Sequence, residues 1–182
     1  DSMRLGLARL PEDQRARFEP EVKAFIGQEA THRRLHGLFN AHLVRQGLRN
    51  VVEQRARRRV ERQAGIDVRI HVAATAATEH LTAIFAEWLF EHPEVLAGCE
   101  PRLATLWLWH AAEEAEHRAT AFDLYRAIGG DLRWRIRIFH HVTLIFLADV
   151  LRQTLRNLWH DRALLRWRTW ASGWKLLLAP HS

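Results

Sequence analysis

The spacing Glu-x-x-His occurs twice in this chain, at Glu29 and His32 and again at Glu114 and His117. Residues three apart on an α-helix differ by about 300° of rotation, so each Glu lies one turn from its His on one helical face. Core-type residues share turns with both pairs: Phe25, Ile26, Leu35 and Phe39 near the first, and Leu106, Trp109, Ala112 and Phe122 near the second. The chain is therefore predicted to form helices that bury both pairs.

Buried carboxylates and imidazoles need partners, and a metal ion is the partner that suits this set of side chains. Glu79, on an apolar stretch between the two pairs, adds a third carboxylate. In ferritin-like two-metal proteins, two helices each supply Glu-x-x-His and two others each supply a Glu. The sequence predicts an all-α fold, a ferritin-like four-helix bundle, with Glu29, His32, Glu79, Glu114 and His117 as ligands of two divalent metal ions. Iron is favoured, and manganese or zinc would also suit these ligands.

Four more side chains are candidates for additional ligands or for a second layer around the metals. His36 and His110 each lie four residues from a predicted ligand, on the same helical face. A metal-bound His usually donates its other ring N–H to a carboxylate or carbonyl, and Glu113 and Asp123 are candidates for that orienting role.

Several runs of the sequence resemble one bacterial family. They are the segments 24–32, 78–83 and 109–117, followed by 121–125 and 129–130. The family is the one described as predicted metal-dependent hydrolase, and the resemblance covers roughly residues 20 to 138. It implies a ferritin-like helical bundle that holds a metal centre.

The resemblance also implies a helix upstream of the first Glu-x-x-His pair. In that family this helix carries a glutamate between a glycine and an aromatic residue, and the ligands follow in the order Glu, Glu-x-x-His, Glu, Glu-x-x-His. No such element precedes Glu29, so we expect the first bundle helix to be truncated, with residues 1–10 as its end. Glu12, Glu19 and Glu21 are expected to be poor substitutes, because they fall in a charged, proline-flanked connector.

Glycine and proline interrupt the helical pattern at well-separated places. The predicted helices cover residues 18–46, 66–92, 101–128, 132–160 and 162–178. The arginine-rich stretch from Arg49 to Arg62 is predicted to be a solvated crossover or an exposed helix. With 182 residues and 48% apolar content, the chain is expected to form a single ferritin-like domain over residues 1–182. Residues 132–182 are expected to be a C-terminal helical extension packed on the bundle.

Cys99 is the only cysteine, which excludes an internal disulfide and a cysteine-based metal site. A reducing cytoplasm is the expected compartment. The net charge of +6 comes almost wholly from arginine. No helix-turn-helix, zinc-finger or RNA-binding signature accompanies this charge, so we do not expect nucleic acid as a partner.

The C-terminal third combines tryptophan with arginine. Residues 136–158 are apolar on much of their circumference, and the tryptophans and arginines that follow or overlap them are Trp159, Trp167, Trp170, Trp174, Arg156, Arg162, Arg166 and Arg168. This composition is typical of a helix that lies on a membrane surface. Polar residues such as Asp149 keep the run well short of the about 20 apolar residues that span a bilayer. The alternative is that this segment packs on the bundle or on a second subunit of a homodimer.

Three functions agree with these patterns. The first is a non-haem di-iron oxidase or oxygenase that acts on an apolar small molecule. Its bridging ligands would be Glu79 and Glu114, with His32 and His117 on one metal each and Glu29 as a terminal ligand. The second function uses two metals for hydrolysis, as the family description supposes. The third is a non-enzymatic helical protein that binds a partner or a membrane surface, with the same side chains in a buried polar network.

Overall fold

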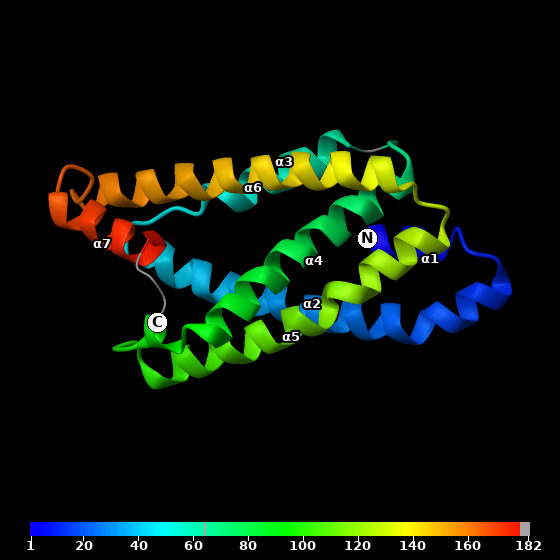
Figure 1. The fold of residues 1–182 in the computed structure, drawn as a ribbon, viewed down its shortest axis with the longest axis horizontal. Helices are drawn as coiled ribbons and strands as arrows, with labels where there is room; N and C mark the ends of the chain where they lie inside the picture. The colour runs from blue at the N-terminus through cyan, green and yellow to red at the C-terminus, as the bar shows by residue number, and fades with distance from the viewer. Residues whose placement is uncertain (64, 179–182) are drawn as a thin grey trace.

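The computed structural model describes residues 1–63 and 65–178, without the side chains of residues 175–178. This part of the chain is helical and contains no strand. Its elements are α1 (Ser2–Leu7), α2 (Glu12–Arg45), α3 (Val51–Arg62), α4 (Val68–Glu91), the 3-10 helix η1 (Pro93–Leu96), α5 (Pro101–Ala127), α6 (Leu132–His160) and α7 (Trp167–Leu178) (Figure 1). The prediction of an all-α fold is confirmed.

Helices α4 and α5 form an antiparallel pair at the centre of the bundle, joined through η1 (Figure 1). Helix α2 packs on α5, and the short helix α1 contacts α2, α4 and α5. Helix α6 packs on α4, and α3 runs beside α6. The bundle thus has two parts, one built from α1, α2, α4 and α5 and one built from α3 and α6.

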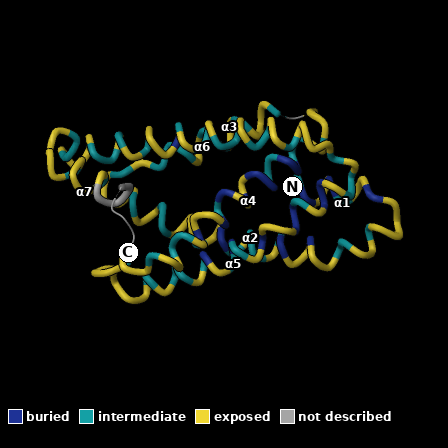
Figure 2. The backbone as a smooth tube through the Cα atoms, in the orientation of Figure 1, coloured by how far each residue is buried: buried dark blue, intermediate teal, exposed yellow. Residues whose placement is uncertain are grey.

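The apolar core lies where α1 meets the three longer helices, as the dark segments of Figure 2 show. Its largest fully buried side chains are Met3, Val22, Val72 and Leu124. The contact with α1 is close, because a Cβ on Gly6 would lie 2.9 Å from Val72 Cγ2 and 3.0 Å from Leu124 Cδ2. This core holds α2 against α5, the two helices that carry the Glu-x-x-His pairs.

Side-chain caps fix the starts of four helices. The side chains of Asn50, Asp67, Glu100 and Asp131 accept hydrogen bonds from backbone N–H groups in the first turns of α3, α4, α5 and α6. Pro101 is the first residue of α5, where its missing N–H costs nothing. The predicted boundaries of α4, α5 and α6 agree with the structure to within two residues.

Helix α2 begins at Glu12, so the prediction of a connector before residue 18 is wrong. Pro20 lies inside the helix and on its exposed side, where the turn before it tolerates the loss of one backbone hydrogen bond. Glu12, Glu19 and Glu21 are therefore helical. Glu21 Oε1 accepts a hydrogen bond from Thr120 Oγ1 at 2.7 Å, which links this part of α2 to α5.

The predicted last helix also starts at a different residue. Helix α7 begins at Trp167 and not at residue 162, because the chain turns after α6 and Arg162 adopts a positive φ of 52°. The turn places Leu165 in solvent, with 94% of its surface exposed.

The arginine-rich segment forms α3, which resolves the choice between a crossover and a helix. Its arginines are not all solvated, since Arg55 Nη1 lies 3.2 Å and Arg59 Nη2 lies 2.7 Å from the carboxylate of Asp149. Asp149 is the one buried residue of α6. This ion-pair cluster holds α3 beside α6.

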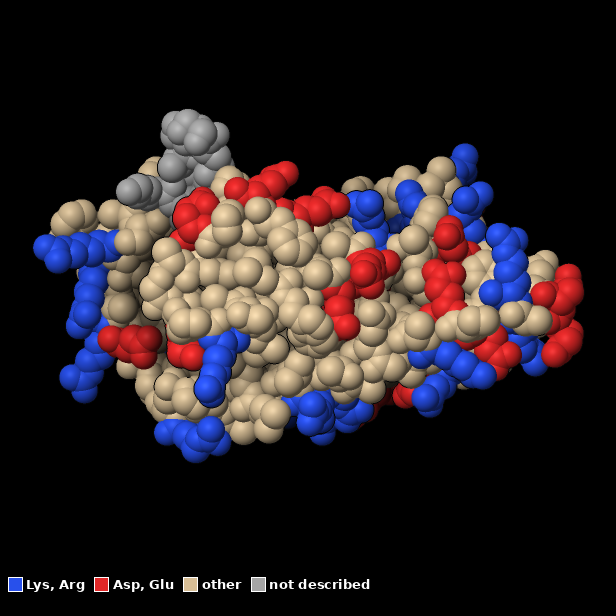
Figure 3. Space-filling model, turned by 90° about the horizontal axis from the view of Figure 1, so that it is seen from below, with Lys and Arg blue, Asp and Glu red and all other residues tan. Residues whose placement is uncertain are grey.

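The surface carries charges of both signs. On the face seen in Figure 3, basic and acidic side chains alternate at one end, and a broad area without charged side chains covers much of the centre. Among the described helices, none is both long enough and apolar enough to cross a membrane.

Candidate metal centre

Helices α2 and α5 bring the two Glu-x-x-His pairs together. Glu29, His32, Glu114 and His117 each offer one ligand atom, and these atoms all lie within 4.8 Å of one another. His32, Glu114 and His117 are buried, whereas the side chain of Glu29 keeps 38% of its surface exposed. The structure therefore gathers four of the five predicted ligands into one cluster with one accessible side.

The carboxylate of Glu29 lies between the two imidazoles. Its Oε1 atom is 3.2 Å from His32 Nδ1 and 3.1 Å from His117 Nδ1. Each imidazole then meets a further carboxylate through the same nitrogen, with Glu114 Oε1 3.3 Å from His32 Nδ1 and Glu79 Oε2 3.6 Å from His117 Nδ1. Glu79, which α4 supplies, is thus a fifth side chain at the edge of the cluster.

The other nitrogen of each imidazole is held by a side chain from the opposite helix. His32 Nε2 lies 2.7 Å from Glu113 Oε2, and His117 Nε2 lies 2.8 Å from Gln28 Oε1. Gln28 Nε2 also donates to Glu113 Oε1 at 3.5 Å. These contacts assign the N–H to Nε2 in both rings and leave each Nδ1 directed at the carboxylates, which is the arrangement of a metal-bound histidine with an orienting partner.

Gln28 also contacts the cluster, and the sequence analysis did not single it out. Its signal is a repeated pattern: Gln28 directly precedes Glu29, as Glu113 directly precedes Glu114. Each of these preceding residues contacts the histidine of the other helix, so the two helices orient each other's ligand.

Burial and neighbouring charges alter the pKa values of the cluster. Burial, together with the carboxylates of Glu29 and Glu114, raises the pKa of Glu79 above its ordinary value. Burial also opposes the charge on Glu29, but the His117 and His32 imidazoles outweigh it and lower the pKa of Glu29. Burial lowers the pKa of His117, yet the Glu29 and Glu79 carboxylates outweigh it and raise this pKa to about 10. In the metal-free cluster, His117 therefore carries a proton on both ring nitrogens, and so a positive charge, at neutral pH.

Two buried atoms of the cluster form no well-aligned hydrogen bond with the described residues, although one of them, His117 Nδ1, lies 3.1 Å from Glu29 Oε1. They are Glu79 Oε2 and His117 Nδ1. Buried polar atoms of native proteins are normally paired, and an oxygen and a nitrogen that face each other at 3.6 Å would both be satisfied by one divalent cation. The donor set of this cluster fits a metal ion.

The rings of His36 and His110 extend the cluster on one side through edge-to-face contacts. The His110 ring centroid is 4.3 Å from that of His32 and 4.9 Å from that of His36, and His110 Nε2 lies 3.6 Å from Glu114 Oε1. Burial and the nearby His32 lower the pKa of both His36 and His110. Neutral imidazoles at this place are competent as further ligands or as hydrogen-bond partners.

A small cavity of about 20 Å³ opens beside the rings of His36 and His110. It is lined by His32, Leu35, His36, Phe39, Leu106, Trp107, Trp109 and His110. The volume is close to that of a single water-sized molecule. Its walls are mainly apolar and aromatic.

Asp123 does not join the cluster. It is exposed and takes part in none of the described contacts around the two imidazoles. The reason is helical geometry, because a residue six positions after His117 is turned by about 240° from the ligand face. The orienting role that the sequence proposed for Asp123 has no counterpart in the structure, whereas Glu113 contacts His32 directly.

Fold and cluster together define an all-helical protein whose buried glutamates and histidines can hold a divalent metal ion. Comparison with protein families gives a more specific result. The chain belongs to the family described as predicted metal-dependent hydrolase, whose model matches residues 2–182. No curated protein and no solved structure matches the chain.

Proposed function

We propose that the cluster holds two divalent metal ions, iron in the native protein, and that the protein is an oxidoreductase acting on an apolar small molecule. The position of Glu29 carries this proposal. Its carboxylate lies between two imidazoles, and each imidazole has a carboxylate of its own, Glu114 at His32 and Glu79 at His117. Two half-sites that share one carboxylate are the pattern of a bridged two-metal centre.

In this assignment, His32 and Glu114 would hold one ion, His117 and Glu79 would hold the other, and Glu29 would be shared by both. The distances thus support Glu29 as the shared carboxylate, whereas the sequence pattern gave that role to Glu79 and Glu114.

Ferrous ions held by carboxylates and imidazoles supply the activation of dioxygen when they are bound. The side chains of this chain have separate tasks. Glu113 and Gln28 hold the Nε2 protons of His32 and His117 and keep each Nδ1 directed at the centre. The 20 Å³ cavity beside His32 and His110 has mainly apolar and aromatic walls and leaves room for one molecule of about the size of water or dioxygen.

Metal content and oxygen uptake test this proposal together. The chain would be loaded anaerobically with ferrous iron and analysed for metal. We expect about two irons per chain and an oxygen-dependent absorption change. The absence of stoichiometric metal after loading would contradict the metal centre itself.

A second candidate is a two-metal hydrolase, which the family description favours. Two metals can lower the pKa of a bridging water and stabilise the attacking and leaving oxygens. Oxygen consumption with ferrous iron, compared with anaerobic turnover of esters and phosphoesters, separates the two chemistries. Bound zinc or manganese, turnover without oxygen and no oxygen uptake would favour hydrolysis. A third candidate, a metal-free polar network in an interaction protein, predicts that chelators leave thermal stability unchanged.

We further propose that the tip formed by the end of α6 and the start of α7 contacts an anionic membrane surface from the cytoplasmic side. Its apolar side chains are unusually exposed: Trp159 and Trp167 keep 73% of their surface, Trp174 keeps 68%, and Leu165 keeps 94%. The neighbouring arginines form no ion pair among the described residues; they are Arg156, Arg162, Arg166 and Arg168. Exposed tryptophan beside free arginine suits an interface with anionic lipids.

Cosedimentation with vesicles tests the membrane contact. We expect the chain to bind vesicles containing phosphatidylglycerol, and Trp159→Ser to weaken that binding. Trp134→Ser is the matched control, since Trp134 is exposed on the other end of α6. Equal binding by all three proteins would contradict the proposal. A dimer in solution that Trp159→Ser converts to a monomer would instead assign this tip to a second copy of the chain.

A further inference from the structure

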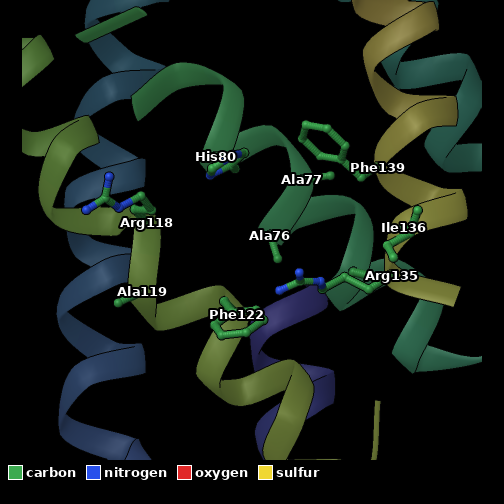
Figure 4. A pocket seen from close by; sticks show the side chains of 10 residues that line it. Ala76, Ala77, His80, Arg118, Ala119, Phe122, Arg135, Ile136 and Phe139 are labelled. Carbon is green, nitrogen blue, oxygen red and sulfur yellow. The ribbon is translucent and has the colours of Figure 1, made fainter. Parts of the chain in front are cut away.

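A second cavity lies outside the metal cluster, between α4, α5 and α6. It has a volume of about 390 Å³, within the range of small-molecule sites. Its residues are Ala73, Ala76, Ala77, His80, Arg118, Ala119, Phe122, Arg135, Ile136 and Phe139. The space exists because α4 and α5 present alanines where α6 diverges from them (Figure 4).

The side walls of this pocket are apolar, and one cationic side chain, Arg135, reaches into its centre. Figure 4 shows the Arg135 guanidinium reaching from α6 to a position between Ala76 and Phe122. Its Cζ atom lies 4.7 Å from the centroid of the Phe122 ring. Phe139 and His80 form the opposite wall, with ring centroids 5.5 Å apart.

The two arginines of the pocket differ in their partners. Arg118 Nη1 lies 2.7 Å from Glu87 Oε1, and its guanidinium points out of the pocket in Figure 4. Arg135 forms no ion pair among the described residues, and no acidic side chain lines the pocket. A half-buried guanidinium with only an aromatic ring beside it retains donors for a planar anion.

We propose that this pocket binds a carboxylate with an apolar chain, such as a medium-chain fatty acid. The carboxylate would accept two parallel hydrogen bonds from the Arg135 guanidinium, which matches it in shape. The apolar chain would lie against Phe122, Phe139 and Ile136. One free guanidinium balances one negative charge, so a monoanion fits better than a dianion.

The proposed site is separate from the metal cluster and does not depend on it. The pocket residues His80 and Arg118 follow the cluster residues Glu79 and His117 in sequence, so the two sites lie on different faces of α4 and α5. Ligand binding here therefore needs no metal, and it can succeed or fail independently of the proposed oxidoreductase.

Calorimetric titration of the chain with decanoate, below its micelle concentration, tests the proposal. The titration is run with and without a chelator, and decanol and decylamine replace decanoate in parallel runs. We expect one decanoate per chain in both conditions, decanol at least about tenfold weaker, and no binding of decylamine. Decanol binding as tightly as decanoate, or no decanoate binding, would overturn the proposal.

Two pairs of variants locate the site. Arg135→Gln should weaken decanoate binding at least about tenfold, whereas Arg137→Gln should not, because Arg137 contacts Trp134 outside the pocket. Ala119→Phe should block binding by filling the space, and Ala112→Phe should not, since Ala112 is an exposed alanine of α5 that does not line the pocket. Full binding by Arg135→Gln or by Ala119→Phe would overturn the assignment.

Discussion

Gln28 and Glu113 occupy equivalent positions, each directly before the glutamate of a Glu-x-x-His pair and each bound to the histidine of the other helix. Replacing Gln28 by Leu keeps the size of the side chain and removes the acceptor of His117 Nε2. We expect metal affinity to fall by about 10- to 100-fold. Competition with a chromophoric chelator measures this change. Gln14→Leu, on the exposed side of the same helix, should leave affinity as it is.

The histidines themselves give a stoichiometric prediction. His117→Ala removes the only imidazole of one proposed half-site, so we expect one of two metals to be lost. His42→Ala is the control, because His42 is an exposed histidine of α2 that contacts Gln46. Elemental analysis after metal loading compares the variants. Unchanged metal content in His117→Ala would rule out its role as a ligand.

Protonation of His117 predicts how metal affinity depends on pH. Its pKa is raised to about 10 in the metal-free fold, above the ordinary value of 6.5. The stability that this proton contributes is complete below pH 6.5 and is lost as pH rises through 10. A metal on Nδ1 must displace the proton, so apparent affinity should rise about tenfold per pH unit within that window. Titrations at pH 7 and 8 check this, and equal affinity at both would contradict proton displacement.

The closeness of Glu29 to His32 and of Glu114 to His117 was predictable from sequence, because both members of each pair lie on one helix at a spacing that fixes their relative position. The placement of Gln28 was not predictable in this way, since its partner is on α5, 89 residues later. Asp123 is a different case, because it lies on the same helix as His117, and the spacing of six residues already turns it about 240° away from that histidine.

At the scale of elements, the boundaries of α4 to α6 followed from glycine, proline and capping residues, whereas the start of α2 did not. Pro20 and the charges around it predict a break, but Val22 and Phe25 are buried against the core and stabilise the helix beyond it. Tertiary burial outweighs the local preference here. The pairing of α3 with α6 was also hidden, because it depends on two arginines meeting one buried aspartate far along the chain.

That pairing predicts a stability change. Asp149→Ala leaves Arg55 and Arg59 without their common carboxylate, and the half-exposed arginines then regain water only in part. We expect the free energy of unfolding to fall by about 1–3 kcal/mol. Urea denaturation measures it, with Asp161→Ala as the exposed control. Equal stability of the two variants would mean that the ion pairs do not hold α3 in place.

At the scale of the whole molecule, the cluster is expected to make the free energy of unfolding depend on whether metal is bound. The raised pKa of Glu79 means that folding disfavours its charge, so the ionised form destabilises the metal-free protein at neutral pH. A divalent ion held by Glu79, as we propose, would reverse the sign of this contribution. At one hundred times its dissociation constant it adds about 2.7 kcal/mol of stability, or roughly 5–10 °C in melting temperature for a chain of this size.

Glu79→Gln should therefore shift the two states in opposite directions. The variant removes a buried charge, so its metal-free form should melt at a higher temperature than the unchanged chain. Its metal-loaded form should melt at a lower temperature, because a ligand is lost. Calorimetry with metal and with a chelator compares Glu79→Gln with Glu91→Gln. Glu91 is exposed at the end of the same helix, so its replacement should leave both melting temperatures unchanged. A shift in the same direction in both states would show that Glu79 supports the fold without binding metal.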